Sequence, residues 1–212
     1  LGNDRIGYVK DDGGNENMHF YAVNIDGSNE IDLTPYDNVQ ARIIDDLEDD
    51  PNHVIIGLNK RNPQIHDPFR VNINTGESEM IAENPGNISS WVTDHDGRLR
   101  MATTSDGVNT SLLYRDTEKD DFKPILTTDF KVNVSPLFFT FDNKNVYVAS
   151  NRDRDKTAIY EFDISKAKEQ ELIFEHDEVD VSGLMYSKKR KVLTGVNFTV
   201  SKGDKVFFDD WR

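Results

Sequence analysis

The stretches ISSWVTDHDGRLRMATTSDGVNTSLLYRD (88–116) and SPLFFTFDNKNVYVASNRDRDKTAIYEFD (135–163) share one pattern. Each opens with an apolar segment that ends in Asp and continues through a polar turn into a β-rich segment. A polar hairpin then leads to a third segment that carries Tyr and Asp. The Asp that ends the first segment recurs at Asp46, Asp94 and Asp142, at intervals of 48 residues. The chain is therefore built from a repeated unit.

A period of about 47 residues, four short strands long, is typical of a β-propeller blade. The sequence predicts an all-β fold, a β-propeller of four-stranded antiparallel blades with three complete and two incomplete blades. We expect one propeller domain over 1–212, with approximate blades at 1–39, 40–86, 87–133, 134–180 and 181–212. Because the repeat starts and stops partway through a unit, we expect a segment of a larger propeller. It would be either an open arc that self-associates through its terminal blades or a closed five-bladed ring.

Composition narrows the possible partners. The net charge is −14, from 39 acidic and 25 basic residues, which argues against nucleic acid or an anionic membrane, because both require clustered cations. The one basic cluster, at 188–191, is interpreted as a solvated hairpin turn. No apolar run approaches the ~20 residues that span a bilayer. The absence of cysteine excludes disulfides and thiolate metal sites, and it leaves the compartment open between cytoplasm and periplasm or secretion.

Catalytic motifs are missing from this sequence. There is no G-x-S-x-G nucleophile elbow, no H-E-x-x-H zinc motif and no glycine-rich phosphate loop. The acidic loop 45–50 lacks the ligand spacing of a calcium-binding loop. We therefore predict no catalytic, cofactor-binding or metal-binding residue, and no cofactor.

Three side chains are candidates for substrate binding. Arg152 and Arg154 lie on a hairpin and could hold a carboxylate, although pairing with neighbouring acids is the favoured interpretation. His66 precedes Asp67, a pair that suggests acid–base chemistry. Adjacent residues of an extended segment point to opposite faces, so we expect this pair to shape a loop between Pro63 and Pro68.

Several segments resemble known families. ASNRDRDKTAIYEFD (149–163) and FYAVNIDGSNEIDLT (20–34) are similar to the TolB-type propeller repeat. A longer match resembles the propeller of bacterial prolyl oligopeptidase-family (S9-like) serine peptidases. Its segments are DDGGNENMHFYAVNIDGSNEIDLTPYDNVQA (11–41), VIIGLNKRNPQIHDPFRVNINTGE (54–77) and ENPGN (83–87). This resemblance spans nearly the whole chain and implies a partner α/β-hydrolase domain in the same parent chain, which would carry the catalytic Ser, Asp and His.

The resemblance implies a non-catalytic propeller segment that gates access to the hydrolase and helps to bind peptide substrates. The alternative is a stand-alone TolB-like module that binds proteins or peptides. A propeller lyase or lactonase is a third hypothesis, and it would need converging metal ligands. The scattered histidines, at 19, 53, 66, 95 and 176, argue against it.

Overall fold

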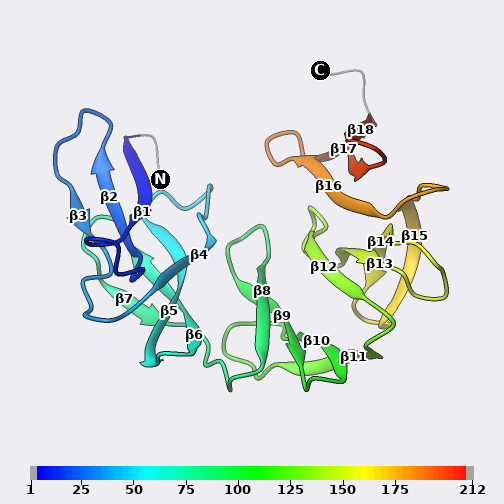
Figure 1. The fold of residues 1–212 in the computed structure, drawn as a ribbon, viewed down its shortest axis with the longest axis horizontal. Helices are drawn as coiled ribbons and strands as arrows, with labels where there is room; N and C mark the ends of the chain where they lie inside the picture. The colour runs from blue at the N-terminus through cyan, green and yellow to red at the C-terminus, as the bar shows by residue number, and fades with distance from the viewer. Residues whose placement is uncertain (1–3, 209–212) are drawn as a thin grey trace. The chain divides into compact units, whose positions relative to one another are not determined.

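The structure, a computed structural model, describes residues 4–208 and confirms the all-β prediction. The described residues form eighteen strands and no helix. The strands group into five antiparallel sheets in which neighbours in sequence are neighbours in the sheet (Figure 1). Three sheets have four strands and two have three, as the repeat predicts. Each sheet is one blade.

The chain divides into two compact units after Ile88. The first unit holds a three-stranded and a four-stranded blade. Blade 1 consists of β1 (Arg5–Lys10), β2 (His19–Asn24) and β3 (Ile31–Asp32); blade 2 consists of β4 (Ala41–Asp45), β5 (His53–Asn62), β6 (Ile65–Asn72) and β7 (Ser78–Met80).

The second unit holds two four-stranded blades and one three-stranded blade. Blade 3 consists of β8 (Ile88–Thr93), β9 (Leu99–Ser105), β10 (Asn109–Tyr114) and β11 (Lys123–Asp129). Blade 4 consists of β12 (Val134–Phe139), β13 (Val146–Ser150), β14 (Ala158–Asp163) and β15 (Lys168–Phe174). Blade 5 consists of β16 (Val181–Ser187), β17 (Val192–Thr199) and β18 (Gly203–Phe207).

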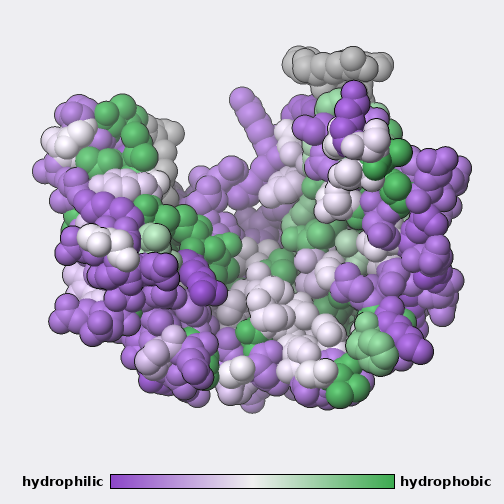
Figure 2. All heavy atoms as spheres, viewed as in Figure 1, coloured by the Kyte–Doolittle hydropathy of each residue, from purple (hydrophilic) through white to green (hydrophobic). Residues whose placement is uncertain are grey.

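Alternating apolar residues of the strands bury the cores. In unit 1, Phe20 and Ala22 of β2 pack with Val54, Ile56 and Leu58 of β5. Unit 2 has two clusters, one centred on blade 4 and one where Ile159 packs with blade 5. The inner strands β5, β13 and β14 bury consecutive residues, so both of their faces are covered. Hydrophilic side chains cover much of the visible surface (Figure 2).

The recurring Asp caps the turn between the first two strands of a blade. Asp94 Oδ1 accepts the Asp96 N–H (3.0 Å), and Asp142 Oδ1 accepts the Lys144 N–H (3.2 Å). In blade 2 the equivalent acceptor is Asp45, which binds the Leu47 N–H at 2.9 Å, rather than Asp46 as the spacing suggests. The pairing register of β4 with β5 shifts between Ile43 and Asp45. β12 and β16 carry similar register shifts against β13 and β17.

Asparagine side chains tie the links between blades to the hairpins. Asn59 Oδ1 accepts the N–H of Gln40 (2.6 Å) in the link to blade 2, and Asn59 Nδ2 donates to Pro63 O (2.9 Å). In blade 4 the Asn151 side chain likewise accepts a backbone N–H from the entering link, that of Asn133, at 2.7 Å. These hydrogen bonds satisfy backbone N–H and C=O groups outside the strands, which have no partner in the sheets.

Consecutive blades are also joined through backbone hydrogen bonds where the first strand of each new blade begins. Ala41 N–H donates to Met18 O (2.7 Å), and Val181 N–H donates to Thr157 O (3.0 Å). Met18 and Thr157 each immediately precede the strand β2 or β14 of the earlier blade. The same junction is thus built twice, once in each unit.

The segment around His66 is a strand and not the loop that we expected from Pro63 and Pro68. β6 begins at Ile65, and Pro68 lies opposite Gly57 of β5. Pairing with β7 reaches only as far as Phe69. Just beyond the end of β7, the Ile81 N–H donates to Pro68 O at 3.0 Å, so the proline lies where the pairing of β6 with β7 ends and its missing N–H is tolerated.

Asp67 anchors the link between blade 2 and the next blade. Its carboxylate is fully buried and accepts two bonds from the Arg61 guanidinium, each 3.1 Å. It also accepts the Asn84 N–H at 2.7 Å, while Arg61 donates to Asn84 O at 2.6 Å. The Asn84 side chain in turn accepts the N–H groups of Gly86 and Ile88. Through this network the ENPGN segment (83–87) is held against blade 2.

We predict that Asp67→Asn destabilises the chain by about 2 kcal/mol, below the 3–5 kcal/mol typical of a fully buried pair because Arg61 is partly exposed. Urea unfolding followed by circular dichroism measures the change. Asp153→Asn is the control, because its side chain is 93% exposed and lies 3.9 Å from Arg152, and it should change stability by less than about 0.5 kcal/mol. Equal effects of the two substitutions would contradict the role given to Asp67.

Candidate functional site

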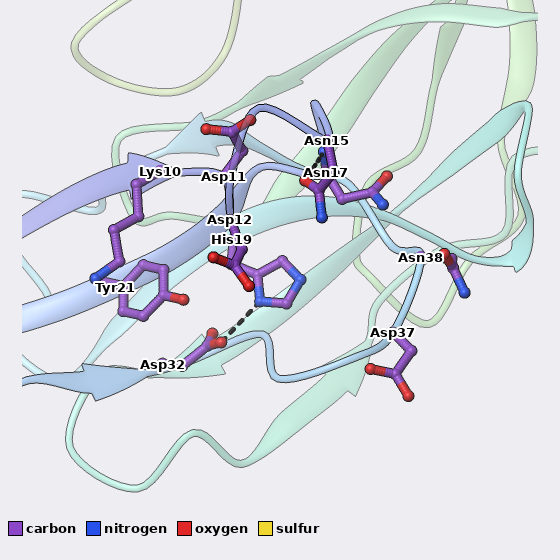
Figure 3. Close-up of a pocket in the computed structure, with 10 residues that line it drawn as sticks. All are labelled: Lys10, Asp11, Asp12, Asn15, Asn17, His19, Tyr21, Asp32, Asp37 and Asn38. Carbon is purple, nitrogen blue, oxygen red and sulfur yellow. Dashed lines mark hydrogen bonds and ion pairs between the residues drawn. The ribbon is translucent and has the colours of Figure 1, made fainter.

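A polar cavity of about 510 Å³ lies at one end of blade 1 (Figure 3). The hairpin between β1 and β2 and the link between β3 and β4 supply most of its walls. Its lining residues are Lys10, Asp11, Asp12, Asn15, Asn17, His19, Tyr21, Asp32, Asp37 and Asn38. All belong to unit 1.

A histidine–aspartate pair forms one wall of the cavity. The His19 Nδ1 atom lies 2.7 Å from Asp32 Oδ2, and both side chains are about three-quarters buried. Because the carboxylate can only accept, Nδ1 carries the proton. Asp32 Oδ1 accepts the Thr34 N–H at 2.8 Å, which holds the carboxylate in place. The imidazole is therefore oriented, with Nε2 directed away from Asp32 (Figure 3).

Lys10 is already engaged at the edge of the cavity. Its ammonium lies 2.7 Å from Glu30 Oε1 and 4.2 Å from the centre of the Tyr21 ring, which stacks on Tyr8 at 5.5 Å. The hydrogen bond to Glu30 raises the pKa of Lys10. Burial, followed by the Asp32 charge, raises the pKa of Tyr21. Both groups therefore keep their protons at neutral pH.

Carboxylates and carboxamides dominate the rest of the lining. Asp11 and Asp12 come from the hairpin and Asp37 from the link, and Asp37 lies on the side of the cavity away from the Lys10 ammonium (Figure 3). In residues 4–208, no group of three or more His, Asp or Glu side chains is placed to hold a metal ion. None of the ten lining residues is Ser, Thr or Cys, so the lining contains none of the hydroxyl or thiol nucleophiles used by serine, threonine and cysteine peptidases. Its chemistry fits binding of a group with several hydrogen-bond donors.

Blade 4 has a second polar cavity at the same place in the repeat. It is lined by its β13–β14 hairpin, by the link to blade 5 and by the end of β17, and has a volume of about 540 Å³. Its acidic residues are Asp155, Glu178 and Asp180. The hairpin end of the repeat therefore forms polar hollows in both units.

Of the predicted candidates, Arg154 is held within its own blade. Its guanidinium hydrogen-bonds to the Tyr160 hydroxyl, with its central carbon 4.2 Å from the Tyr160 ring centre. It also lies 3.5 Å from Glu169 and 3.9 Å from Glu175. Arg152 is more exposed and lies 3.9 Å from Asp153. Neither arginine lines the blade 1 cavity.

His66 does not pair with Asp67, whose carboxylate faces Arg61. The His66 Nε2 atom is buried without a hydrogen-bond partner, and the His66 Cβ lies 3.5 Å from where a Cβ on Gly57 would be. Burial, together with the Arg42 charge, lowers the pKa of His66. The imidazole is therefore neutral at neutral pH, and no second catalytic group accompanies it.

Sequence reasoning missed His19 and Asp32. The register pairs Tyr21 with Asp32, and His19 lies two residues before Tyr21, on the same face of the blade. The alternation in HFYAVNID could have revealed the shared face, because the Asp-Gly turn that follows fixes the hairpin register.

The chain is similar to curated peptidases over most of its length, although no family model matches it. It is 30% identical over 191 residues to dipeptidyl aminopeptidase BIII of Pseudoxanthomonas mexicana, covering 86% of this chain and 27% of that protein. It is 23% identical to dipeptidyl peptidase family member 6 of Caenorhabditis elegans, covering 91% of this chain and 28% of that protein. The chain thus spans little more than a quarter of the length of these relatives.

Solved structures show the same propeller fold. TolB from Acinetobacter baumannii matches with a TM-score of 0.64 and 16% identity, over 95% of this chain and 49% of TolB. An oligogalacturonate lyase solved with manganese matches at 0.66 and 10% identity, over 97% of this chain and 56% of the lyase. A prolyl endopeptidase matches with a TM-score of 0.57 and 12% identity, over 93% of this chain and 31% of the endopeptidase. The chain is a TolB-like β-propeller homologous to S9-family peptidases.

We predict that His66 makes the chain less stable in mild acid. Its pKa is lowered in the folded state from an ordinary value of 6.5, so the unfolded chain binds the proton more readily. This contribution is fully present above pH 6.5 and is lost as the pH falls towards the folded pKa. Between about pH 7.5 and about pH 5, which lie on either side of the ordinary His pKa, urea unfolding should show a smaller loss of stability for His66→Gln than for the unchanged chain. An identical loss of stability in the variant and in the unchanged chain would contradict this prediction.

Proposed function

We propose that this chain, a propeller homologous to prolyl oligopeptidase-family peptidases, is the non-catalytic propeller part of a serine peptidase. In this role it limits access of peptides to an α/β-hydrolase domain and helps to hold them. The observation that carries the proposal is the 30% identity to a dipeptidyl aminopeptidase over 86% of the chain. The sequence contains no nucleophile elbow, which is consistent with chemistry performed by another domain.

The hairpin-end cavity supports the substrate-binding part of the proposal. Its carboxylates and the oriented His19 can accept and donate hydrogen bonds, as the polar ends and backbone of a peptide require. A stand-alone TolB-like interaction module is the alternative, and the likeness to TolB is one of fold alone. A lyase role has less support, because residues 4–208 offer no metal-binding cluster.

Sequencing the parent gene on both sides of this segment tests the domain assignment. We expect an open reading frame that continues into a region with G-x-S-x-G followed by Asp and His. The full gene product should cleave dipeptidyl p-nitroanilides and lose that activity to a serine-directed phosphonate, whereas the 212-residue chain alone should cleave none. A stop codon directly after Arg212 would overturn the proposal and leave the interaction module.

Substitutions in the cavity test the binding role in the full gene product. Asp12→Asn with Asp37→Asn should raise KM for peptides several-fold and leave kcat unchanged, because these residues would contribute binding that is equal in the ground and transition states. The matched control is Asp121→Asn with Asp153→Asn, which removes the same charge at two exposed positions outside both cavities. Unchanged KM in the cavity variant would remove the cavity from the substrate path, without affecting the domain assignment.

A further inference from the structure

Strand β1 has the place of a second strand in the repeat, although it is the first strand of its sheet. The blade junction shows this, because Ala41 N–H donates to Met18 O and Val181 N–H donates to Thr157 O. Met18 directly precedes β2, and Thr157 directly precedes β14, which is the third strand of blade 4. β2 is therefore the third strand of its unit and β1 the second. Within residues 4–208, blade 1 has no first strand.

The exposure of β1 is unlike that of the other second strands. In each complete blade the second strand lies between the first and the third, and β5, β9 and β13 each bury at least three residues. β1 pairs with β2 on one side, at the edge of its sheet (Figure 1). None of its residues is buried, and Ile6 and Val9 are 51% and 45% exposed. The side of β1 where a first strand would lie is thus uncovered in the described part of the chain.

Backbone groups of β1 point towards this uncovered side. The Ile25 N–H donates to Asp4 O at 3.0 Å, and these two residues continue the register in which β1 pairs with β2. Hydrogen-bonded pairs alternate along an antiparallel ladder, so the even-numbered residues of β1 bond to β2. The N–H and C=O groups of Gly7 and Val9 consequently point away from β2. Such an edge is a template for one more strand.

We propose that a segment of the parent chain that precedes Leu1 adds to β1 as the first strand of blade 1. It would run antiparallel to β1, as β4 does to β5 and β12 to β13, and would bond to the backbone of Gly7 and Val9. Backbone hydrogen bonds would hold it, as in other cases of strand addition. The inference rests on the proposed parent chain, and this chain spans only 27% and 28% of the length of its curated relatives.

The repeat also predicts the sequence of this added strand. The Asp that ends a first strand recurs every 48 residues, and the same interval counted back from Asp46 falls three residues before Leu1. We expect the parent gene to encode an Asp within about five residues of that position, preceded by a short β-rich segment with apolar residues. Sequencing the gene upstream of Leu1 checks this. A gene that lacks such a segment would overturn the inference.

Amide hydrogen exchange tests the pairing itself, with residue resolution from fragmentation in the mass spectrometer. The amides of Gly7 and Val9 should exchange quickly in the 212-residue chain and at least roughly tenfold more slowly in the full gene product, where the added strand accepts from them. The control is Ile56 of β5, which has a strand on each side in this chain and should be protected in both proteins. Equal exchange of Gly7 and Val9 in the two proteins would overturn the inference.

Proline substitution separates the two sides of β1. Val9→Pro removes an N–H that points away from β2, a position where an edge strand tolerates proline. In the 212-residue chain it should leave the exchange of the Tyr8 amide within about twofold, whereas in the full gene product it should speed exchange at Gly7 roughly tenfold. Tyr8→Pro is the matched control, because it removes an N–H that bonds to β2 and should speed exchange along β1 in both proteins. No effect of Val9→Pro at Gly7 in the full product would contradict the pairing, and the comparison of the unchanged proteins does not depend on this variant.

Photo-cross-linking identifies the strand that adds. With p-benzoylphenylalanine in place of the exposed Ile6, the full gene product should form a cross-link to the segment that precedes Leu1. A cross-link to residues that follow Arg212 would overturn the inference in favour of closure by the other end of the chain. A gene with the upstream strand but no hydrolase region would overturn the proposed function and leave this inference standing.

Discussion

The structure depends on satisfying the backbone where the chain leaves one blade and enters the next. The strands pair their own N–H and C=O groups, but the links have no ladder partner. Asn59 and Asn151 each accept a backbone N–H of the link that enters their blade. Asn59 also donates to Pro63 O in its own hairpin, whereas Asn151 donates to Lys131 O in the same entering link. Asn84 and Asp67 do so for the link that leaves blade 2. A buried carboxamide can donate and accept at once, which suits it to a link that offers both kinds of group.

The architecture could be predicted from the sequence because its causes are local. Alternating apolar residues decide the buried face of each strand, and Asp at the strand end caps the turn. The links could not be predicted in the same way, because Asn59 meets Gln40 across 19 residues and nothing in the spacing marks the pair. The prolines near His66 suggested a loop, but Pro68 lies in β6 at the point where pairing with β7 ends. That end point is a property of the folded sheet and not of the local sequence.

The residues of the candidate site were likewise hard to predict from the sequence. The sequence suggested Arg152, Arg154 and His66 as candidates because of their residue types alone. In the structure, Arg154 holds β14 and β15 together, and the His66 ring nitrogen is buried. His19 and Asp32 meet only through the register of the β1–β3 sheet. The hairpin and the link that line the cavity are also the segments most free to vary, because they lie outside the ladder.

The bulge in β4 has a consequence for how such chains diverge. A residue inserted at the end of this strand is absorbed where the register already shifts, so the alternation in the rest of the blade is preserved. Blades can therefore change length by single residues without reversing which side chains face the core. Such tolerance lets the backbone path persist where few residues are shared, and the match to TolB, at 16% identity and a TM-score of 0.64, is such a likeness of fold alone.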